Sequence, residues 1–122
     1  MAVVELNKDN FEQTITDNEF VIVDFWAPWC GPCRSFAPTY EKVSEEYSDV
    51  VFAKVNTEDE QEIGAHFNIR SIPTLMIFRE QVIIFSQAGA LPETAFKDLI
   101  GKAKELDMAE VHKQIQEEQA KA

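Results

Sequence analysis

The most constraining feature of the chain is a run of eight residues, Phe20 to Ala27, that is apolar on both faces except for Asp24. Such a run is typical of a strand buried in the middle of a sheet. The motif Trp-Cys-Gly-Pro-Cys follows at residues 29–33. After it, apolar and aromatic residues recur at the spacing of one helix face: Phe36, Tyr40, Val43 and Tyr47. We therefore predict a buried strand that passes directly into a helix, with two cysteines at the junction.

The two cysteines differ in their predicted positions. Cys30 lies at the N-terminus of the predicted helix, and Cys33 lies one turn inside it. Unpaired backbone N–H groups and the helix dipole favour a thiolate at this end, so we assign Cys30 as the nucleophile and Cys33 as the resolving thiol. Gly31 and Pro32 control the loop between them, because proline is tolerated in a first helical turn and is rigid. The spacing predicts a dithiol that opens and closes as the Cys30–Cys33 disulfide.

Two structural uses of the cysteines compete with redox chemistry. A disulfide that closes so short a loop removes little entropy from the unfolded chain, so it would be a weak structural staple. A zinc site would need two further ligands, and the two histidines, His66 and His112, do not have the spacing of zinc ligands. We therefore expect redox chemistry, with neither a metal nor an organic cofactor.

Length and charge restrict the class of protein further. A chain of 122 residues forms one domain with a single core. Its net charge of −11 disfavours nucleic acid and anionic membrane surfaces as partners, because contacts to phosphates need clustered Lys and Arg. No apolar run approaches the roughly 18 residues of a membrane helix, and the first residues lack the pattern of a secretory signal. We expect a cytoplasmic monomer.

Hydrophobic periodicity divides the chain into alternating strands and helices. We expect strands at residues 3–6, 20–27, 50–55, 74–78 and 82–86. Helices are expected after Asn7, which would cap the first of them, at residues 31–47 and 58–67, and after Pro92. This order predicts an α/β protein in which helices cover both faces of a central mixed β-sheet.

Two segments depart from this regular pattern. The turn at residues 78–82 contains no glycine, so a tight turn with positive φ would be strained and we expect a rearranged or longer turn. Beyond Leu106 the helical phase changes, and Asp107 with Glu110 resembles a capping box. We therefore divide the chain into a domain at residues 1–106 and a short C-terminal helical extension at residues 107–122. The extension is either a solvated helix or a surface for a partner.

Three separate stretches carry a resemblance to a known family. They are Val23-Asp24-Phe25-Trp26-Ala27, the Trp-Cys-Gly-Pro-Cys motif, and Arg70-Ser71-Ile72-Pro73-Thr74, with Gly89-Ala90-Leu91 where the family has a similar turn. With these motifs the chain resembles the thioredoxin family over residues 1 to about 106. The resemblance implies the thioredoxin fold, protein substrates that contain disulfides, and reduction of the dithiol by a thioredoxin reductase.

Residues around the cysteines receive roles from the same resemblance. Burial in an apolar strand should raise the pKa of Asp24 towards neutrality, and the family carboxylate at this position relays a proton for the second cysteine. Lys54 matches a lysine near that carboxylate, and Pro73 matches a cis-proline beside which substrates bind. The other substrate-binding positions are Trp29, Gly31, Pro32, Ile72, Gly89 and Ala90. The alternatives are a structural carboxylate at position 24, an ordinary edge charge at position 54 and core packing for Trp29.

Together these features predict a protein-disulfide reductant that cycles between a dithiol and a disulfide at Cys30 and Cys33. An oxidase or isomerase role is disfavoured by the Gly-Pro pair between the cysteines and by the lack of a recognisable signal sequence. An alternative of a different class is a thioredoxin-like interaction module, in which the C-terminal extension binds a partner and redox activity is secondary.

Overall fold

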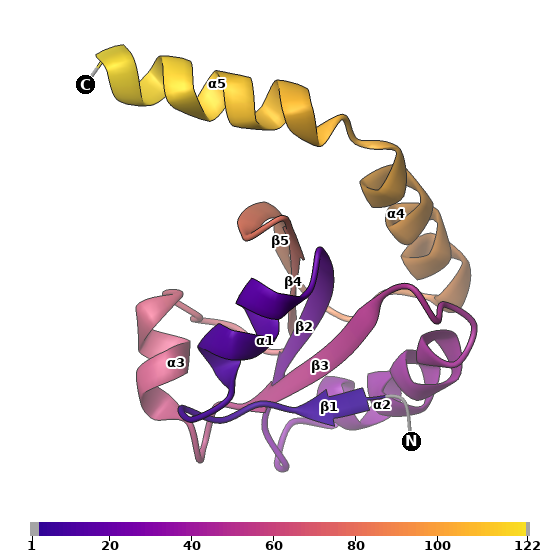
Figure 1. Ribbon diagram of the computed structural model, residues 1–122. Helices are drawn as coiled ribbons and strands as arrows, with labels where there is room; N and C mark the ends of the chain where they lie inside the picture. The colour runs from indigo at the N-terminus through magenta and orange to yellow at the C-terminus, as the bar shows by residue number, and fades with distance from the viewer. Residues whose placement is uncertain (1–2, 122) are drawn as a thin grey trace.

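Five strands form one mixed sheet in the computed structural model, which describes residues 3–121 (Figure 1). The strands are β1 (Val3–Glu5), β2 (Phe20–Trp26), β3 (Val51–Asn56), β4 (Thr74–Arg79) and β5 (Val82–Ala88). The helices are α1 (Phe11–Asp17), α2 (Gly31–Ser44), α3 (Gln61–His66), α4 (Glu93–Glu105) and α5 (Met108–Lys121). The order in the sheet is β1-β3-β2-β4-β5. The predicted α/β architecture, with helices on both faces and a further C-terminal helix, is confirmed.

The central strand of the sheet is β2, which carries the apolar run seen in the sequence. It pairs in parallel with β3 and antiparallel with β4, and its residues Val21, Val23 and Phe25 are fully buried. Alternate side chains of a strand point to opposite faces, so a strand covered by helices on both sides is apolar on both. The end of β2 is therefore a well-supported base for the residues that follow it.

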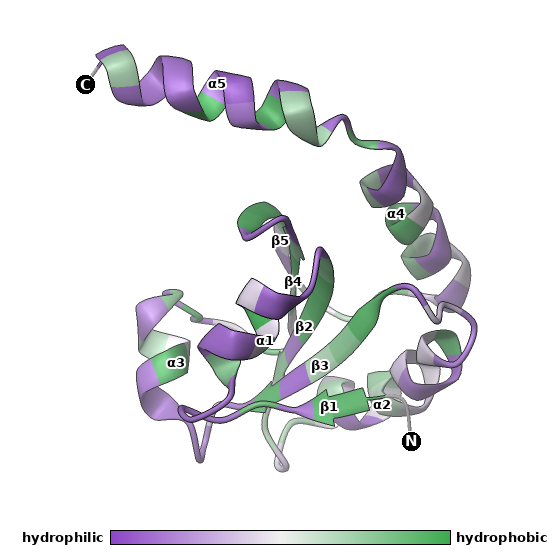
Figure 2. Ribbon diagram, viewed as in Figure 1, coloured by the Kyte–Doolittle hydropathy of each residue, from purple (hydrophilic) through white to green (hydrophobic). Residues whose placement is uncertain are grey.

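Two apolar cores lie on opposite faces of the sheet. On one face, α2 and α4 pack on β2 and β3; on the other, α1 and α3 do so. The first core is rich in aromatic rings, because the ring centre of Phe96 lies 5.6 to 6.1 Å from those of Phe36, Tyr40 and Phe52. Figure 2 shows the central strands as mostly hydrophobic, whereas α5 is mostly hydrophilic. The cores hold the sheet and four helices together, while α5 contributes little to either.

The turn between β4 and β5 contradicts the expectation of a rearranged or longer loop. It has only two residues, Glu80 and Gln81, and their φ angles are both positive, at 50° and 70°. A two-residue hairpin needs this twist, and residues other than glycine adopt it at a cost of about 1–2 kcal/mol each. Two contacts hold Glu80. Its N–H donates to the carbonyl oxygen of Glu19 at 2.8 Å, and its carboxylate lies 3.1 Å from Nε2 of His112 in α5.

The start of α1 also differs from the prediction. We expected Asn7 to cap this helix, but α1 begins at Phe11, and Asn10 is the residue before it. The side-chain oxygen of Asn7 instead accepts hydrogen bonds from the N–H groups of Asp9 (2.8 Å) and Asn10 (3.1 Å). Asparagine readily forms such a local turn, and α1 begins directly after it. The helices α2 and α3 are likewise shorter than their periodicity suggested.

The C-terminal extension forms α5, which turns away from the direction of α4 (Figure 1). The Asp107 carboxylate accepts a hydrogen bond from the N–H of Glu110 at 3.2 Å, so this residue caps the helix as predicted. Met108 is buried, whereas Val111 and Ile115 are only half-buried. Within residues 3–121, no helix is both long and apolar enough to cross a membrane.

Candidate functional site

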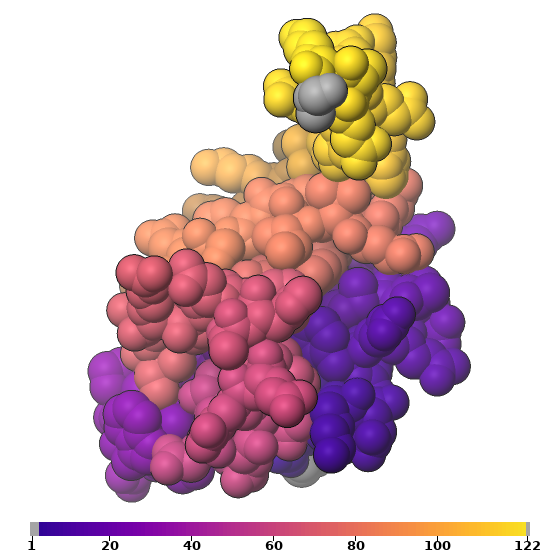
Figure 3. Space-filling view, turned by 90° about the vertical axis from the view of Figure 1, so that its left-hand side faces the viewer, coloured from indigo at the N-terminus to yellow at the C-terminus, as the bar shows by residue number. Residues whose placement is uncertain are grey.

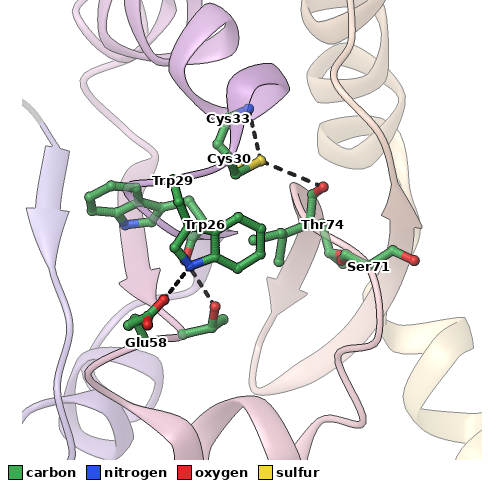
Figure 4. The surroundings of a disulfide bond; sticks show 9 residues. Trp26, Trp29, Cys30, Cys33, Glu58, Ser71 and Thr74 are labelled. Carbon is green, nitrogen blue, oxygen red and sulfur yellow. Dashed lines mark hydrogen bonds between the residues drawn. A yellow bond between two sulfur atoms is a disulfide. The ribbon is translucent and has the colours of Figure 1, made fainter.

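The two cysteines lie where β2 gives way to α2. They form a disulfide, with 5.3 Å between their Cα atoms (Figure 4). Cys30 is the N-cap residue of α2, Pro32 lies in the first turn, and the backbone N–H of Cys33 donates to Cys30 Sγ at 3.2 Å. This N–H is one of the donors that a helix N-terminus leaves without a backbone partner. The local fold therefore places a hydrogen-bond donor and the positive end of the helix dipole on the Cys30 sulfur, which favours a thiolate there after reduction.

A second loop reaches the disulfide from the start of β4. The Ile72–Pro73 peptide bond is cis, and the carbonyl oxygen of Ile72 lies 3.7 Å from Cys30 Sγ. The N–H of Gly89, directly after β5, donates to the carbonyl oxygen of Pro73 at 2.8 Å. Ala90 is the next residue and is exposed. Segments far apart in the sequence therefore meet beside the cysteines, at one end of the strands.

Trp29 stands on the surface next to the motif, where it is 69% exposed. Its indole N–H donates a hydrogen bond to the carboxylate of Glu58, which follows β3 (Figure 4). A groove of about 380 Å³ lies beside the indole and is also lined by Ile72 and by residues of α3. The alternative of core packing for Trp29 is therefore wrong. A large exposed aromatic side chain beside an apolar groove is a surface suited to binding a peptide.

Asp24 is the one buried acidic residue among residues 3–121, at 4% exposure. It shares its face of β2 with Ile22, on the side that α2 covers, and its Oδ1 has no hydrogen-bond partner within the described range. Burial raises the pKa of this carboxyl to about 7, and the charge of Lys54 opposes the rise. Lys54 is the register partner of Asp24 on β3, and its Nζ lies 5.1 Å from the ring centre of Trp26. A basic group thus stands next to a carboxyl that titrates near neutral pH.

The sequence matches the thioredoxin family over residues 2–102, a range that contains both cysteines, Asp24 and the cis-proline. The chain belongs to the thioredoxin family. It is 60% identical over 121 residues to the protein named "Putative thioredoxin 2" of Streptomyces coelicolor, covering 99% of this chain and 90% of that protein. It is also 41% identical over 104 residues to the thioredoxin of Porphyra purpurea, covering 84% of this chain and 97% of that protein.

Solved structures of thioredoxins have the same fold. The structure of Plasmodium falciparum thioredoxin is 38% identical, with a TM-score of 0.76, and covers 84% of this chain and 98% of its own. A mutant thioredoxin from Halobacterium salinarum is 30% identical, with a TM-score of 0.79, and covers 86% of this chain and 93% of its own. Membership of the thioredoxin family makes this protein a thiol-disulfide oxidoreductase, and Cys30–Cys33 is its redox pair. Among residues 3–121, no group of three or more potential metal-ligating side chains comes together.

Two residues near the thioredoxin motif were missed by the sequence reasoning. Glu58 holds the indole of Trp29, and a signal for it existed: Glu58 and Trp29 follow the neighbouring parallel strands β3 and β2, whose carboxyl ends meet. The hydroxyl of Tyr40 lies within hydrogen-bond distance of the carbonyl oxygens of Ile22 (2.9 Å) and Ala53 (2.7 Å), and so fixes α2 on the sheet. Tyr40 was recognised only as an apolar position, because helical periodicity carries no information about the hydroxyl group.

Proposed function

We propose that this protein reduces disulfides of protein substrates, with Cys30 as the nucleophile and Cys33 as the resolving thiol. The Cys30 thiolate attacks one sulfur of a substrate disulfide, which forms a mixed disulfide and releases the other substrate sulfur as a thiolate. Cys33 then attacks the Cys30 sulfur, so that the Cys30–Cys33 disulfide forms and the second substrate thiolate leaves. The substrate gains two electrons and the protein loses two. The position of Cys30 at the N-terminus of α2, one turn before Cys33, is the observation that carries this proposal.

Asp24 is the group we propose as the proton acceptor for the second step. Cys33 must lose a proton before it attacks, and Asp24 lies on the face of β2 that α2 covers. A carboxyl with a pKa of about 7 both accepts and releases a proton readily near neutral pH. Its Oδ1, which has no hydrogen-bond partner among residues 3–121, is the atom that would take the proton. Lys54 supports the ionised form, because its positive charge lowers the pKa of Asp24.

The surface around the disulfide is the proposed substrate-binding site. Trp29 and Ile72 provide apolar contact, and the backbone at Pro73 and Gly89 offers polar groups to an extended segment of the substrate. Gly31, Pro32 and Ala90, all exposed, complete this surface.

The remaining parts of the proposal concern the setting of the reaction. Family membership supports a thioredoxin reductase as the electron donor that returns the disulfide to the dithiol. We propose that the protein works as a cytoplasmic monomer without a cofactor, and that residues 1–106 form the redox domain with residues 107–122 as an extension. Every residue with a proposed redox role lies at or before Ala90, so the extension has no part in the chemistry.

Trapping a mixed disulfide tests the roles of the two thiols. In a Cys33→Ser variant, no internal thiol can resolve the intermediate, so we expect a stable adduct between Cys30 and a disulfide-containing peptide, visible by mass spectrometry. The matched Cys30→Ser variant should form little adduct, because Cys33 lies inside the first turn of α2 and not at the N-cap position that favours a thiolate. A stable adduct on Cys33 together with none on Cys30 would reverse the assignment. Undiminished disulfide reduction by the double Cys30→Ser, Cys33→Ser variant would rule out the redox function itself.

A further inference from the structure

The strand β5 forms an open edge of the sheet. Its ladder partner is β4, and within residues 3–121 no hydrogen bond reaches the main chain of β5 from its outer side. The strand reads Val-Ile-Ile-Phe-Ser-Gln-Ala and contains neither a charge nor a proline. Natural proteins usually protect an edge strand with such residues, because unpaired backbone groups attract another strand. Although β5 carries a bulge at Ile84, an apolar edge strand without charges or prolines is suited to binding an extended segment.

A groove runs between this edge and α5. It has a volume of about 540 Å³, and its apolar lining comes from Val82, Ile83 and Ile84 of β5 and from Val111 and Ile115 of α5. The register shifts between Ile77 and Phe78 of β4, which pair with Phe85 and Ile83, so Ile84 is an extra, bulged residue of β5 at the groove. Ile83 is 45% exposed in it. Figure 3 shows α5 standing above the surface of the β4–β5 hairpin.

The wall formed by α5 is anchored at its N-terminal end. Met108 is buried, and His112 contacts Glu80 in the hairpin turn. Within the described residues, the rest of α5 makes no side-chain hydrogen bond or ion pair to the hairpin. Three exposed charged residues of this part also line the groove: Glu117, Glu118 and Lys121. Two carboxylates and one ammonium group give the groove a net negative charge. The whole chain, at −11, adds to the attraction for a basic partner.

The groove is connected to the redox site by β5 itself. The strand starts at the groove with Val82 and ends at Ala88, and the next residue, Gly89, is bonded to Pro73 beside the disulfide. Seven residues of strand span about 20 Å. A substrate whose disulfide lies at Cys30 could therefore place a neighbouring segment along the same edge and reach the groove.

We propose that the groove between β5 and α5 is an auxiliary binding site for substrate proteins that carry an extended segment of alternating apolar and basic residues about 20 Å from their disulfide. The segment adds to β5 as a further strand, its apolar side chains contact Ile83 and Ile115, and its basic side chains face Glu117 and Glu118. This proposal rests on the proposed reductase function and names a class of its substrates. A second copy of this chain is a poorer occupant, because it would bring two acidic surfaces together.

Three synthetic peptides test the proposal. Each has the same small disulfide loop. The first has nothing else, the second continues through a spacer of about 12 Gly and Ser residues to Val-Lys-Val-Arg-Val-Lys-Val, and the third has Glu in place of Lys and Arg. Such a spacer reaches about 19 Å on average, which matches the distance along β5. Since tethering raises the effective concentration at the redox site, we expect the second peptide to have a KM about tenfold below the other two.

Variants with substitutions in the groove test whether the lower KM of the basic peptide depends on this groove. Ile115→Lys and Ile83→Lys should each raise the KM of the basic peptide to that of the plain loop, while kcat for the plain loop stays unchanged. Gln13→Lys on the exposed surface of α1 adds the same charge elsewhere and should leave the tenfold preference intact. Circular dichroism checks that each variant keeps its fold, and two independent groove variants guard against failure of one to fold.

Each other result contradicts the proposal in a recognisable way. Equal KM values for all three peptides, with normal reduction, would exclude the auxiliary site and leave the reductase function standing. An equal gain for the acidic peptide would exclude the basic partner. A dimer in analytical ultracentrifugation that Ile115→Lys dissociates would assign the groove to a second copy instead. Failure of the wild-type protein to reduce even the plain loop would overturn the reductase function on which the proposal rests.

Discussion

Replacing Asp24 by Asn changes the stability of the protein in a pH-dependent way that the structure allows us to calculate. Burial raises the pKa of Asp24 to about 7 in the folded protein, against 3.8 for an ordinary aspartate. Between these two values the folded protein binds more protons than the unfolded chain, so its stability falls as the pH rises. Each pH unit in this window costs up to about 1.4 kcal/mol. Above the folded pKa the loss is complete, and further change is small.

The expected magnitude follows from these values. Between pH 5.5 and pH 8.5 the wild-type protein should lose about 2 kcal/mol of stability relative to Asp24→Asn, most of it below pH 7. Asparagine has the same shape but no charge, so near neutral pH the variant should be as stable as the wild type or more so. Its turnover of a disulfide peptide should fall, because the proton acceptor for Cys33 is gone.

Guanidinium unfolding of the oxidised proteins at several pH values measures this difference, since other titrating groups affect both proteins alike. Asp17→Asn, at an exposed carboxylate on α1, controls for the loss of one negative charge. A wild-type-minus-variant curve that stays flat across the range would show that Asp24 does not titrate near neutrality in the folded protein. A variant that is less stable and fully active would make Asp24 a structural residue alone.

Three further predictions address the rest of the fold. Truncation after Leu106 should leave the reduction rate of a plain disulfide peptide within about twofold, under ~0.5 kcal/mol, as measured by single-turnover kinetics; a larger loss in a folded protein would place α5 at the redox site. Gln81→Gly should stabilise the protein by about 0.5 kcal/mol in chemical denaturation, because glycine adopts the positive φ of 70° without strain; a lower stability would mean that the turn is not strained. Phe96→Ala should destabilise it by about 3–5 kcal/mol in the same measurement, because the ring is fully buried among three others; a cost below 1 kcal/mol would contradict this packing.

The sequence was sufficient to predict the sheet, the helices that cover it and the redox centre. The apolar run of β2 identifies the central strand because a strand with helices on both faces has no polar side to show. The cysteine spacing identifies the N-terminus of α2, because a helix N-terminus favours a thiolate whatever the rest of the fold. Local patterns are reliable where local physics decides the structure.

Other features depend on contacts that no local pattern contains. The two-residue turn at Glu80 and Gln81 is strained locally, and its contacts to Glu19 and His112, 61 and 32 residues away, come from the assembled fold. Contacts between residues so far apart in the chain cannot be predicted from neighbouring residues. The indole of Trp29 likewise donates a hydrogen bond to Glu58 only because β2 and β3 are adjacent. Such pairings become predictable once the strand order is known, and not before.

The disulfide closes a ring that contains only Gly31 and Pro32 between its cysteines. An unfolded chain with so small a ring behaves, around the sulfurs, like a free tetrapeptide of the same four residues. In the thermodynamic cycle that joins folded, unfolded, oxidised and reduced states, the tetrapeptide can therefore represent the unfolded corner. The difference in unfolding free energy between the two redox forms then equals the bias that the folded surroundings place on the dithiol. Two denaturation curves and one peptide potential would thus measure, without any protein partner, how far the fold itself makes this chain a reductant.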